Sequence, residues 1–295
     1  MVSTAILLIC LASISAGAAE LLSDFRPSAQ HSDYGDVSDV EFFTELIELD
    51  AGVLAFHPDH AMRNFRFAEP VWIIGYQTHV LDAKNAQPRE NYLCHTFVGD
   101  QRVTQHDDRE MLALYSDAFT PHVRLPDGFG FRLAAGESLH WMPLFNNRQE
   151  QPVRIRMNGV ISVIREKDRS KAMRPLYSTL RSVNTPHLFF VQPGRHEFQK
   201  SFQAPFDGRI HFMGTHIHPH GVSVELYDVT HARLVWRSSR GLDDAGQMIG
   251  MDTFGSKAGY AVKAGDMFRI TAVYDNPTAA PIDAMAGLFI SYSRN

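Results

Sequence analysis

The chain has 295 residues, of which 28 are Lys or Arg and 33 are Asp or Glu, and its formal net charge is -5 at pH 7. A chain of this length can bury two hydrophobic cores of ordinary size, and a composition that is 44% hydrophobic and 21% charged excludes a disordered protein. Because the basic residues are scattered along the sequence, the chain offers no electrostatic footprint for binding nucleic acid.

The first segment with a clear pattern is the apolar run Ala5–Ser15, which is followed by the small residues Ala16–Ala18. This order is typical of the hydrophobic region and the cleavage site of a secretory signal peptide, and the run is too short to span a bilayer. We therefore predict a signal peptide over residues 1–19, a secreted or periplasmic location and no membrane span. Removal of this peptide would leave Cys94 as the one cysteine of the mature chain, and hence no internal disulfide.

A short helix is expected over Val40–Leu49, with Asp39 as its N-cap. The remainder consists of short apolar or alternating segments between clusters of Pro, Gly, Asp and Asn, a pattern typical of β-sandwiches. In the first half, strands are predicted over Val71–Val80, Tyr92–Val98, His140–Phe145 and Val153–Arg165. In the second half, strands are predicted over Arg195–Phe202, Arg209–His218, Val222–Asp228, Leu234–Ser238, Tyr260–Lys263, Met267–Tyr274 and Ala284–Ser293.

The segment Asp168–Pro186 is basic and irregular, and it indicates a domain boundary. We predict an N-terminal β-sandwich domain over residues 20–170, a linker over residues 171–186 and a C-terminal β-sandwich domain over residues 187–295. The expected fold class is therefore all-β, with two tandem antiparallel sandwiches of the jelly-roll kind after the signal peptide.

The densest cluster of potential metal ligands lies in Thr215–Gly221, at the end of a predicted strand. Because side chains alternate along a strand, His216 and His218 project from the same face, roughly 6.5 to 7 Å apart along the chain, and both imidazoles can reach one ion. Pro219 ends regular pairing, so His220 is not counted as a ligand. A His-rich strand face without a metal is the alternative, since short His patterns also match by chance.

A further ligand has to come from another strand, because no Cys, Asp or Glu near this pair has the spacing of a zinc motif. Met285 lies in the last predicted strand among the small residues Ala284, Ala286 and Gly287, which leave room beside its sulfur. Taken alone, a Met in an apolar strand is a core residue. Together with two imidazoles, however, a thioether forms a donor set that suits copper(I).

In these residues the chain resembles the copper type II, ascorbate-dependent monooxygenases, which include the peptidylglycine alpha-hydroxylating and dopamine beta-monooxygenases. The C-terminal sandwich of that family carries a His-x-His pair near a glycine and a Met within an Asp-x-Met strand. His216, His218 and Gly221 match the first motif, and Asp283 and Met285 match the second, in the same order and at a similar separation.

The resemblance extends from about Val71 to the C-terminus, and Asn91–Phe97 and Leu125–Phe131 have counterparts in uncharacterised bacterial relatives of the family. It identifies the chain as similar to a distant, bacterial type of member. The resemblance implies one copper ion bound by the His-His-Met set, at which dioxygen binds and a C–H bond is attacked, with an external reductant such as ascorbate.

The family's other copper, which three histidines of the first domain hold, is only partly matched. Its adjacent His pair falls at Cys94-His95 and its third His falls near Phe145-Asn146, so only His95 remains as an imidazole. On a regular strand Cys94 and His95 would point to opposite faces. We therefore expect a degenerate first copper site and a buried, unreactive Cys94. The other histidines of the first domain show no spacing above chance: His57, His60, His79, His106, His122 and His140.

Three functions follow as hypotheses. The first is an exported mono-copper oxidoreductase that uses dioxygen to hydroxylate a small-molecule or peptide substrate; its catalytic residues are not assigned by the sequence. The second is a non-catalytic, extracytoplasmic copper carrier or sensor on the same fold. The third is a structural or carbohydrate-binding protein that uses neither site, because a fold alone does not determine function.

Overall fold

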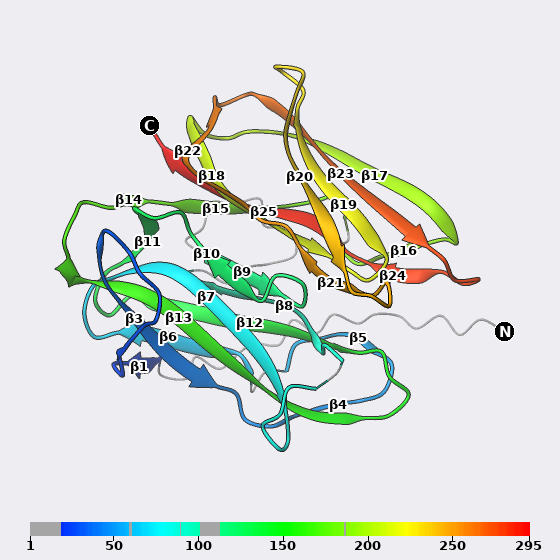
Figure 1. Ribbon diagram of the computed structural model, residues 1–295, viewed down its shortest axis with the longest axis horizontal. Helices are drawn as coiled ribbons and strands as arrows, with labels where there is room; N and C mark the ends of the chain where they lie inside the picture. The colour runs from blue at the N-terminus through cyan, green and yellow to red at the C-terminus, as the bar shows by residue number, and fades with distance from the viewer. Residues whose placement is uncertain (1–18, 59–60, 89, 101–112, 186) are drawn as a thin grey trace.

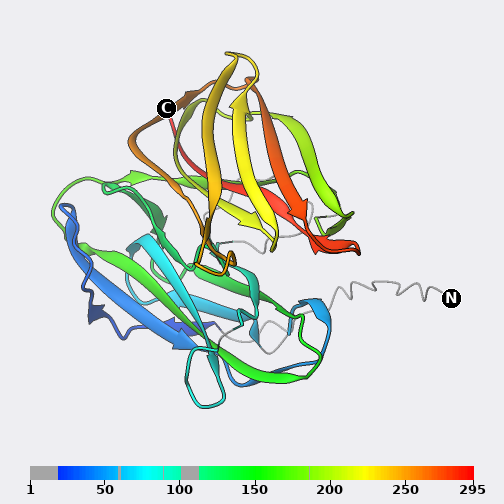
Figure 2. The same cartoon turned by 45° about the vertical axis from the view of Figure 1, so that its right-hand side comes forward.

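The computed structural model describes residues 19–58, 61–88, 90–100, 113–185 and 187–295. These residues form β-strands and no α-helix, apart from turns and irregular segments, so the predicted all-β fold class is confirmed. Two sandwiches lie one above the other, the first in blue to green and the second in yellow to red (Figures 1 and 2). Residues 1–18 of the predicted signal peptide lie outside the described ranges.

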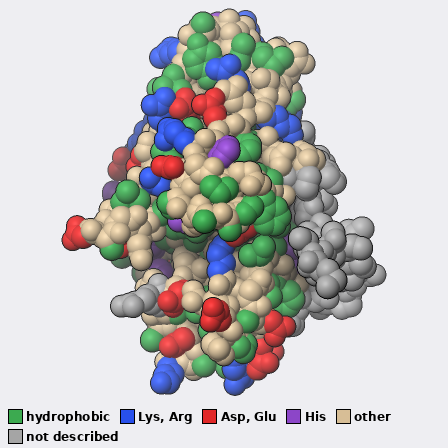
Figure 3. All heavy atoms as spheres, turned by 90° about the vertical axis from the view of Figure 1, so that its right-hand side faces the viewer, with side chains coloured by type: hydrophobic (Ala, Val, Ile, Leu, Met, Phe, Trp, Pro, Cys, Tyr) green, Lys and Arg blue, Asp and Glu red, His purple; other side chains and the backbone are tan. Residues whose placement is uncertain are grey.

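Within the described ranges, no helix is long and apolar enough to cross a membrane. On the face shown in Figure 3, acidic and basic side chains lie interspersed with apolar ones. This matches the scattered charge of the sequence.

The strands of the first sandwich are β1 (Glu20–Leu22), β2 (Arg26–Pro27), β3 (Gly35–Phe43), β4 (Ile47–Leu49), β5 (Val53–Phe56), β6 (Arg63–Phe67), β7 (Val71–Asp82), β8 (Leu93–Gly99), β9 (Ala113–Asp117), β10 (His122–Arg124), β11 (Phe129–Leu133), β12 (Ser138–Asn147), β13 (Val153–Arg169) and β14 (Arg174–Pro175). A six-stranded sheet has the order β1-β6-β12-β8-β9, with β5 beside β12. An eight-stranded sheet has the order β14-β11-β7-β13-β3-β2, with β10 beside β7 and β4 beside β13.

The strands of the second sandwich are β15 (Tyr177–Ser182), β16 (Phe189–Val191), β17 (Gly194–Gln203), β18 (Gly208–Ile217), β19 (Gly221–Asp228), β20 (Arg233–Leu242), β21 (Met248–Met251), β22 (Phe254–Val262), β23 (Met267–Asn276), β24 (Ile282–Ala284) and β25 (Ala286–Arg294). One sheet has the order β15-β25-β18-β22 and the other has the order β17-β23-β19-β20-β21, while β16 and β24 form a short pair. The predicted strands of both halves are confirmed, with ends shifted by a few residues.

Each sandwich buries its own core between its two sheets. In the first, the ring of Trp141 lies 4.8 Å from that of Phe42 in an edge-on arrangement, and its indole N–H donates to the Tyr76 hydroxyl at 2.5 Å. In the second, the ring of Phe206 stacks on that of Tyr292 with centroids 3.5 Å apart. Buried aromatic pairs of this kind contribute about 0.5–1.5 kcal/mol each beyond the area they bury.

The two sandwiches contact one another through apolar side chains of β8, β9 and β25. Phe289 of β25 packs against Phe97 of β8 and Tyr115 of β9, with ring centroids 6.2 Å and 5.8 Å apart. Because β25 pairs with β18, this contact brings the end of β18 close to β8. The interface therefore sets the distance between the two strands that carry the candidate site.

The helix expected over Val40–Leu49 is not formed, and the segment contains the strands β3 and β4 instead. Both strands pair with β13, and burial alternates along β3: Val40 and Phe42 are buried while Glu41 between them is exposed. Asp39 accepts a hydrogen bond from the Ser162 hydroxyl of β13 and caps no helix. Pairing with a long central strand has thus overridden the helical propensity of the segment.

The linker expected over residues 171–186 contributes a strand to each sandwich. Within it, β14 pairs with β11 of the first sandwich and β15 pairs with β25 of the second. Leu176, between these two strands, is fully buried. The chain therefore passes from one sandwich to the other as packed structure, which restricts how far the sandwiches can move apart.

Candidate metal centre

His216 and His218 lie at the end of β18, where this strand meets the first sandwich. His216 pairs with Gly287 of β25, and His218 is the first residue after the strand. The His218 backbone N–H lies 3.1 Å from the Tyr274 hydroxyl and 3.3 Å from the Met285 carbonyl, and both oxygens accept from it. The two imidazole rings are nearly perpendicular, with centroids 5.2 Å apart. The structure thus brings the predicted His pair together.

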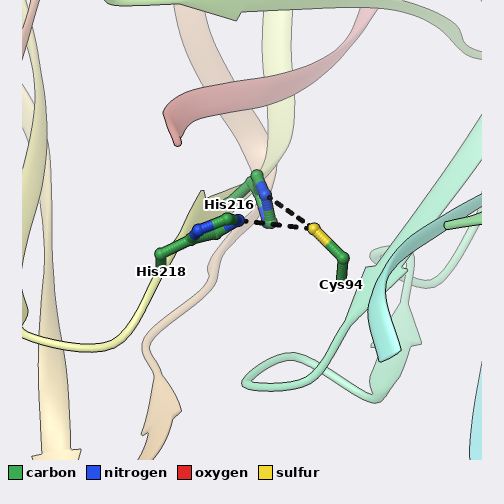
Figure 4. Close-up of side chains that lie close together, drawn as sticks. All are labelled: Cys94, His216 and His218. Atoms are coloured by element: carbon green, nitrogen blue, oxygen red, sulfur yellow. Dashed lines mark hydrogen bonds between the residues drawn. The ribbon is translucent and has the colours of Figure 1, made fainter. Parts of the chain in front are cut away.

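Cys94 of β8 points at the same two imidazoles from the other side of the interface (Figure 4). Its Sγ atom lies 3.7 Å from His216 Nε2 and 3.3 Å from His218 Nε2, and the three donor atoms all lie within 4.8 Å of one another. A metal ion with metal–sulfur and metal–nitrogen bonds of about 2.3 and 2.0 Å holds such donors about 3.5–3.7 Å apart. The observed spacing therefore fits one bound ion.

A β-bulge explains how both Cys94 and His95 reach this centre. Leu144 of β12 pairs with His95, whereas the next residue, Phe145, pairs with Leu93, so Cys94 has no partner in the ladder. Such a bulge re-aims side chains that would otherwise alternate. As a result, His95 Nδ1 lies 3.4 Å from Cys94 Sγ, and its ring lies 4.7 Å from that of His216. The alternation that would send Cys94 and His95 to opposite faces of a regular strand does not apply, because the strand is irregular at this point.

A carboxylate orients each histidine of the pair. His216 Nδ1 lies 3.1 Å from Asp117 Oδ2, and His218 Nδ1 lies 2.7 Å from Asp283 Oδ2. A carboxylate oxygen accepts these hydrogen bonds, so each Nδ1 is the donor and each Nε2 presents its lone pair to the centre. Arg148 Nη2 also lies near His218 Nδ1, but at 3.2 Å this contact is longer than the 2.7 Å contact to Asp283. Metal-bound histidines are held in this way, with the second ring nitrogen bonded to a carboxylate.

Asp117 is itself fixed from several sides at the end of β9. The backbone N–H groups of Phe119 and Thr120 donate to its Oδ1 at 2.9 and 2.6 Å, and the Tyr115 hydroxyl donates to its Oδ2 at 2.6 Å. Its side chain is buried. A residue of the first sandwich thereby orients a histidine of the second.

Asp283 is held by a guanidinium that crosses the interface in the same way. Arg148, which follows β12, donates from Nη2 to Asp283 Oδ2 at 2.6 Å and from Nε to Oδ1 at 3.2 Å. Its Nη1 donates to Asn146 Oδ1 at 2.7 Å. Although burial opposes ionisation, the hydrogen bonds from His218 and Arg148 hold the pKa of Asp283 below its usual range. The Asp283 carboxylate is therefore ionised and available to His218.

Burial sets the protonation states at the centre of the group. It lowers the pKa of His218 to about 4, against the opposing effect of the hydrogen bond to Asp283, and it lowers the pKa of His95 well below the usual value. It also raises the pKa of the Cys94 thiol. At neutral pH the imidazoles of His218 and His95 are therefore neutral, which is the form that binds metals.

Met285 lies beside the group, between β24 and β25. Its side chain is buried in a small apolar cluster with Cys94 and Leu144. Its carbonyl oxygen accepts the Tyr274 hydroxyl at 2.5 Å, and Tyr274 thereby links the backbones of Met285 and His218. The structure thus places a thioether next to the thiol, and a direct role of Met285 as a ligand stays a prediction.

The group forms part of the wall of a cleft with a volume of about 520 Å³. The first sandwich contributes Tyr92, Cys94 and Arg148 to this wall, and the second contributes His218 and Met248. A ligand as large as a small organic molecule fits a space of this size. Cys94, His216 and His218 therefore border this cleft, although their side chains are buried.

The other first-domain histidines with described positions make contacts of their own, although His57 also lies close enough to His95 to add to the effect of burial in lowering its pKa. His57 Nδ1 lies 2.8 Å from the Pro143 carbonyl oxygen, and the rings of His79 and His122 lie 5.4 Å apart. His140 Nδ1 lies 2.7 Å from Asn64 Oδ1. His60 and His106 lie outside the described residues. None of the four described ones joins a group with metal-ligand spacing.

A second group with suitable donors consists of Asp228, His231 and Asp266. Here His231 is exposed, and its ring and backbone nitrogens both donate to the Asp228 carboxylate at 2.8 Å. The Tyr260 hydroxyl donates to the same carboxylate at 2.8 Å. These hydrogen bonds account for the cluster as a turn-stabilising network.

Sequence patterns did not reveal Asp117 or Arg148, because each lies far along the chain from the histidine that it supports and belongs to no local motif. Asp283 was present in the Asp-x-Met match, but its role as the partner of His218 follows only from the structure. Cys94 was noted in the sequence only as part of the expected degenerate first copper site. Its contact with the second-domain histidines required the bulge and the domain arrangement.

No family model matches the chain, and no curated protein matches it. Among solved structures, N-glycanase F (PNGase F) is similar with a TM-score of 0.45 and 10% identity, over 87% of this chain and 96% of that one. The major capsid protein P2 of bacteriophage PM2 gives a TM-score of 0.38 and 9% identity, and the match covers 85% of this chain and 98% of that one. PNGF-II gives a TM-score of 0.32 and 11% identity, and the match covers 93% of this chain and 64% of that one. All three TM-scores lie below 0.5, so these similarities identify neither a family nor an activity.

Proposed function

We propose that this protein binds one copper ion through His216, His218 and a sulfur ligand, and that it is a mono-copper oxidoreductase. The observation that carries the proposal is a pair of carboxylate-oriented imidazoles whose Nε2 atoms face a sulfur atom at the wall of a cleft. The resemblance of His216, His218 and Met285 to the copper ligands of ascorbate-dependent monooxygenases agrees with this donor set.

The donor types favour copper over other metals. Calcium and magnesium prefer oxygen ligands, but here Asp117 and Asp283 turn their oxygens to the Nδ1 atoms and away from the centre. Imidazole and sulfur donors suit copper and zinc, and copper binds more tightly in the usual order of divalent ions. When bound, copper would supply one-electron redox chemistry and the activation of dioxygen.

The residues of the chain would orient and admit the reactants. Asp117 and Asp283 fix the ring orientation of the two histidines, and the cleft beside Cys94 admits a small-molecule or peptide side chain. Hydroxylation of a C–H bond consumes one dioxygen, two electrons and two protons and yields an alcohol and one water. Both electrons would come from an external reductant such as ascorbate, because only one copper is proposed.

The second candidate is a copper carrier or sensor outside the cytoplasm. The observation that favours it is the position of Asn146, where the related enzymes would carry the third histidine of their electron-donating copper: its side chain here accepts a hydrogen bond from Arg148. A protein that binds one copper ion, and has no second copper to donate an electron, is as well suited to carrying copper as to catalysis. Transfer of copper to an apo-acceptor protein, without turnover, would favour this candidate.

The experiment is oxygen consumption by copper-loaded protein supplied with ascorbate and a panel of small-molecule and peptidyl substrates. An oxidoreductase consumes oxygen in a substrate-dependent manner, and the His218→Ala variant loses this activity while the exposed His31→Ala variant keeps it. Copper-loaded protein that stays inert across the panel, but donates its copper to an acceptor, would replace the first candidate by the second.

A further inference from the structure

We propose that the sulfur ligand of this centre is the Cys94 thiolate and not the Met285 thioether, so that one metal ion is held jointly by the two sandwiches. The inference rests on the proposed copper binding and specifies its ligand set. Among the described His, Cys, Asp and Glu residues, His216 and His218 form a group with metal-ligand spacing only together with Cys94.

The geometry of the three donors carries the argument. Cys94 Sγ lies 3.7 Å from His216 Nε2 and 3.3 Å from His218 Nε2, so the first distance falls in the range of about 3.5–3.7 Å expected for donors around one ion and the second is slightly shorter. Asp117 or Asp283 engages the other ring nitrogen of each histidine, so each Nε2 is left facing Cys94 Sγ. A thiolate is also a stronger ligand for copper than a thioether, which binds weakly and at longer distance.

The backbone around Cys94 supports a role beyond packing. The bulge in β8 leaves Cys94 out of the ladder with β12, and the Cys94 side chain contacts His216 and His218 of the second sandwich. A cysteine that only filled an apolar core would not need this irregularity, since a regular strand alternates its side chains. Bulges of this kind are frequent next to functional sites.

Two of the supporting contacts cross the same interface. Asp117 of the first sandwich orients His216 of the second, and Arg148 of the first sandwich pairs with Asp283 of the second. Beside them, Phe289 packs against Phe97 and Tyr115. The partners that fix the ligands are therefore in place only when the two sandwiches are docked, so a bound ion would hold them together.

Copper binding at Cys94 releases one proton, and reduction of the bound copper takes up one electron. When copper(II) binds, the S–H bond of Cys94 breaks, a copper–sulfur bond forms and one proton passes to solvent. Reduction to copper(I) then takes one electron from ascorbate or another small reductant, with no further bond change required in the protein. Two histidines and one cysteine, with a methionine nearby, are the ligand set of copper centres that exchange single electrons.

The test is optical and electron paramagnetic resonance spectroscopy of protein loaded with one equivalent of copper(II). All variants carry Cys10→Ser, so that Cys94 is the one thiol of the chain. We expect an intense visible absorption band from charge transfer between thiolate and copper. This band should disappear in Cys94→Ser, which still binds copper more weakly through the two histidines, and should persist in the matched Met285→Leu variant.

Loss of the thiolate ligand and loss of copper binding give different results in this experiment. A wild-type protein that binds one copper without a charge-transfer band, or whose band survives in Cys94→Ser, would overturn the thiolate ligand and leave copper binding intact. A protein that binds no copper would overturn both. Circular dichroism of each variant in the near ultraviolet verifies that the tertiary structure is retained.

Discussion

The Nε2 atom of His218 lies 3.3 Å from the Sγ atom of Cys94, although 124 positions separate these residues in the chain and they belong to different sandwiches. The contact depends on three independent features: the bulge in β8, the end of β18 beside Pro219 and the apolar interface around Phe289. Each feature can be altered by mutation without touching the others. The account of the centre can therefore be tested one feature at a time.

Replacing Asp283 by Asn tests the orientation of His218. The amide keeps the shape of the side chain but no longer presents two acceptor oxygens to His218 Nδ1 and Arg148. Loss of such a partner lowers metal affinity by about 10–100-fold. Competition with a chelator of known affinity measures this change, and the exposed Asp244→Asn variant should bind copper like the wild type. If Asp283→Asn binds copper as tightly as Asp244→Asn, Asp283 does not support the copper ligands.

Replacing Asp117 by Ala should lower the free energy of unfolding as well as the copper affinity. The change leaves the backbone N–H groups of Phe119 and Thr120 and the Tyr115 hydroxyl without their common acceptor. Each buried donor without a partner costs about 1–3 kcal/mol. Urea unfolding of the metal-free protein measures the loss, with the exposed Asp36→Ala as the control. If the Asp117→Ala variant unfolds at the same urea concentration as the wild type, the hydrogen bonds to Asp117 contribute nothing to stability.

How much of this could be predicted from the sequence differs between the fold and the site. Most strands were predictable because alternation and turn residues are local signals, as in Val71–Val80. The segment Val40–Leu49 was mistaken for a helix because its strand structure depends on pairing with β13, more than 100 residues away. The His pair was a local signal too. The contact between Asp117 and His216 was not, because it joins two sandwiches across 99 positions and follows only from how they dock.

Metal loading should stabilise both sandwiches together. An ion that binds the folded state and not the unfolded chain adds about 2.7 kcal/mol at a concentration of 100 times its Kd. If Cys94 and His218 share that ion, calorimetry should show one transition that moves to higher temperature with copper and returns when a chelator removes it. Two separate transitions, of which copper shifts only one, would indicate that a single sandwich holds the metal.

Substituting Phe289 by Leu should weaken copper binding without touching a ligand. Phe289 packs against Phe97 and Tyr115, and its shortening leaves a void at the interface that positions β8 and β18. Truncating a buried Phe fully to Ala costs about 3–5 kcal/mol, and the Leu variant should lose less than that. The matched control is Phe268→Leu in the second core, which should lose similar stability and keep its copper affinity. If Phe289→Leu binds copper as tightly as Phe268→Leu, the packing of Phe289 at the interface does not position the copper ligands.

The most direct test of the central claim is X-ray absorption at the copper edge on the copper(I) form of the wild type and of Met285→Leu. We predict one copper per chain with two imidazole nitrogens and one sulfur scatterer at about 2.3 Å, and the same sulfur in Met285→Leu, since the sulfur belongs to Cys94. A spectrum without sulfur, or a sulfur signal that disappears when Met285 is replaced, would contradict a centre built from Cys94, His216 and His218.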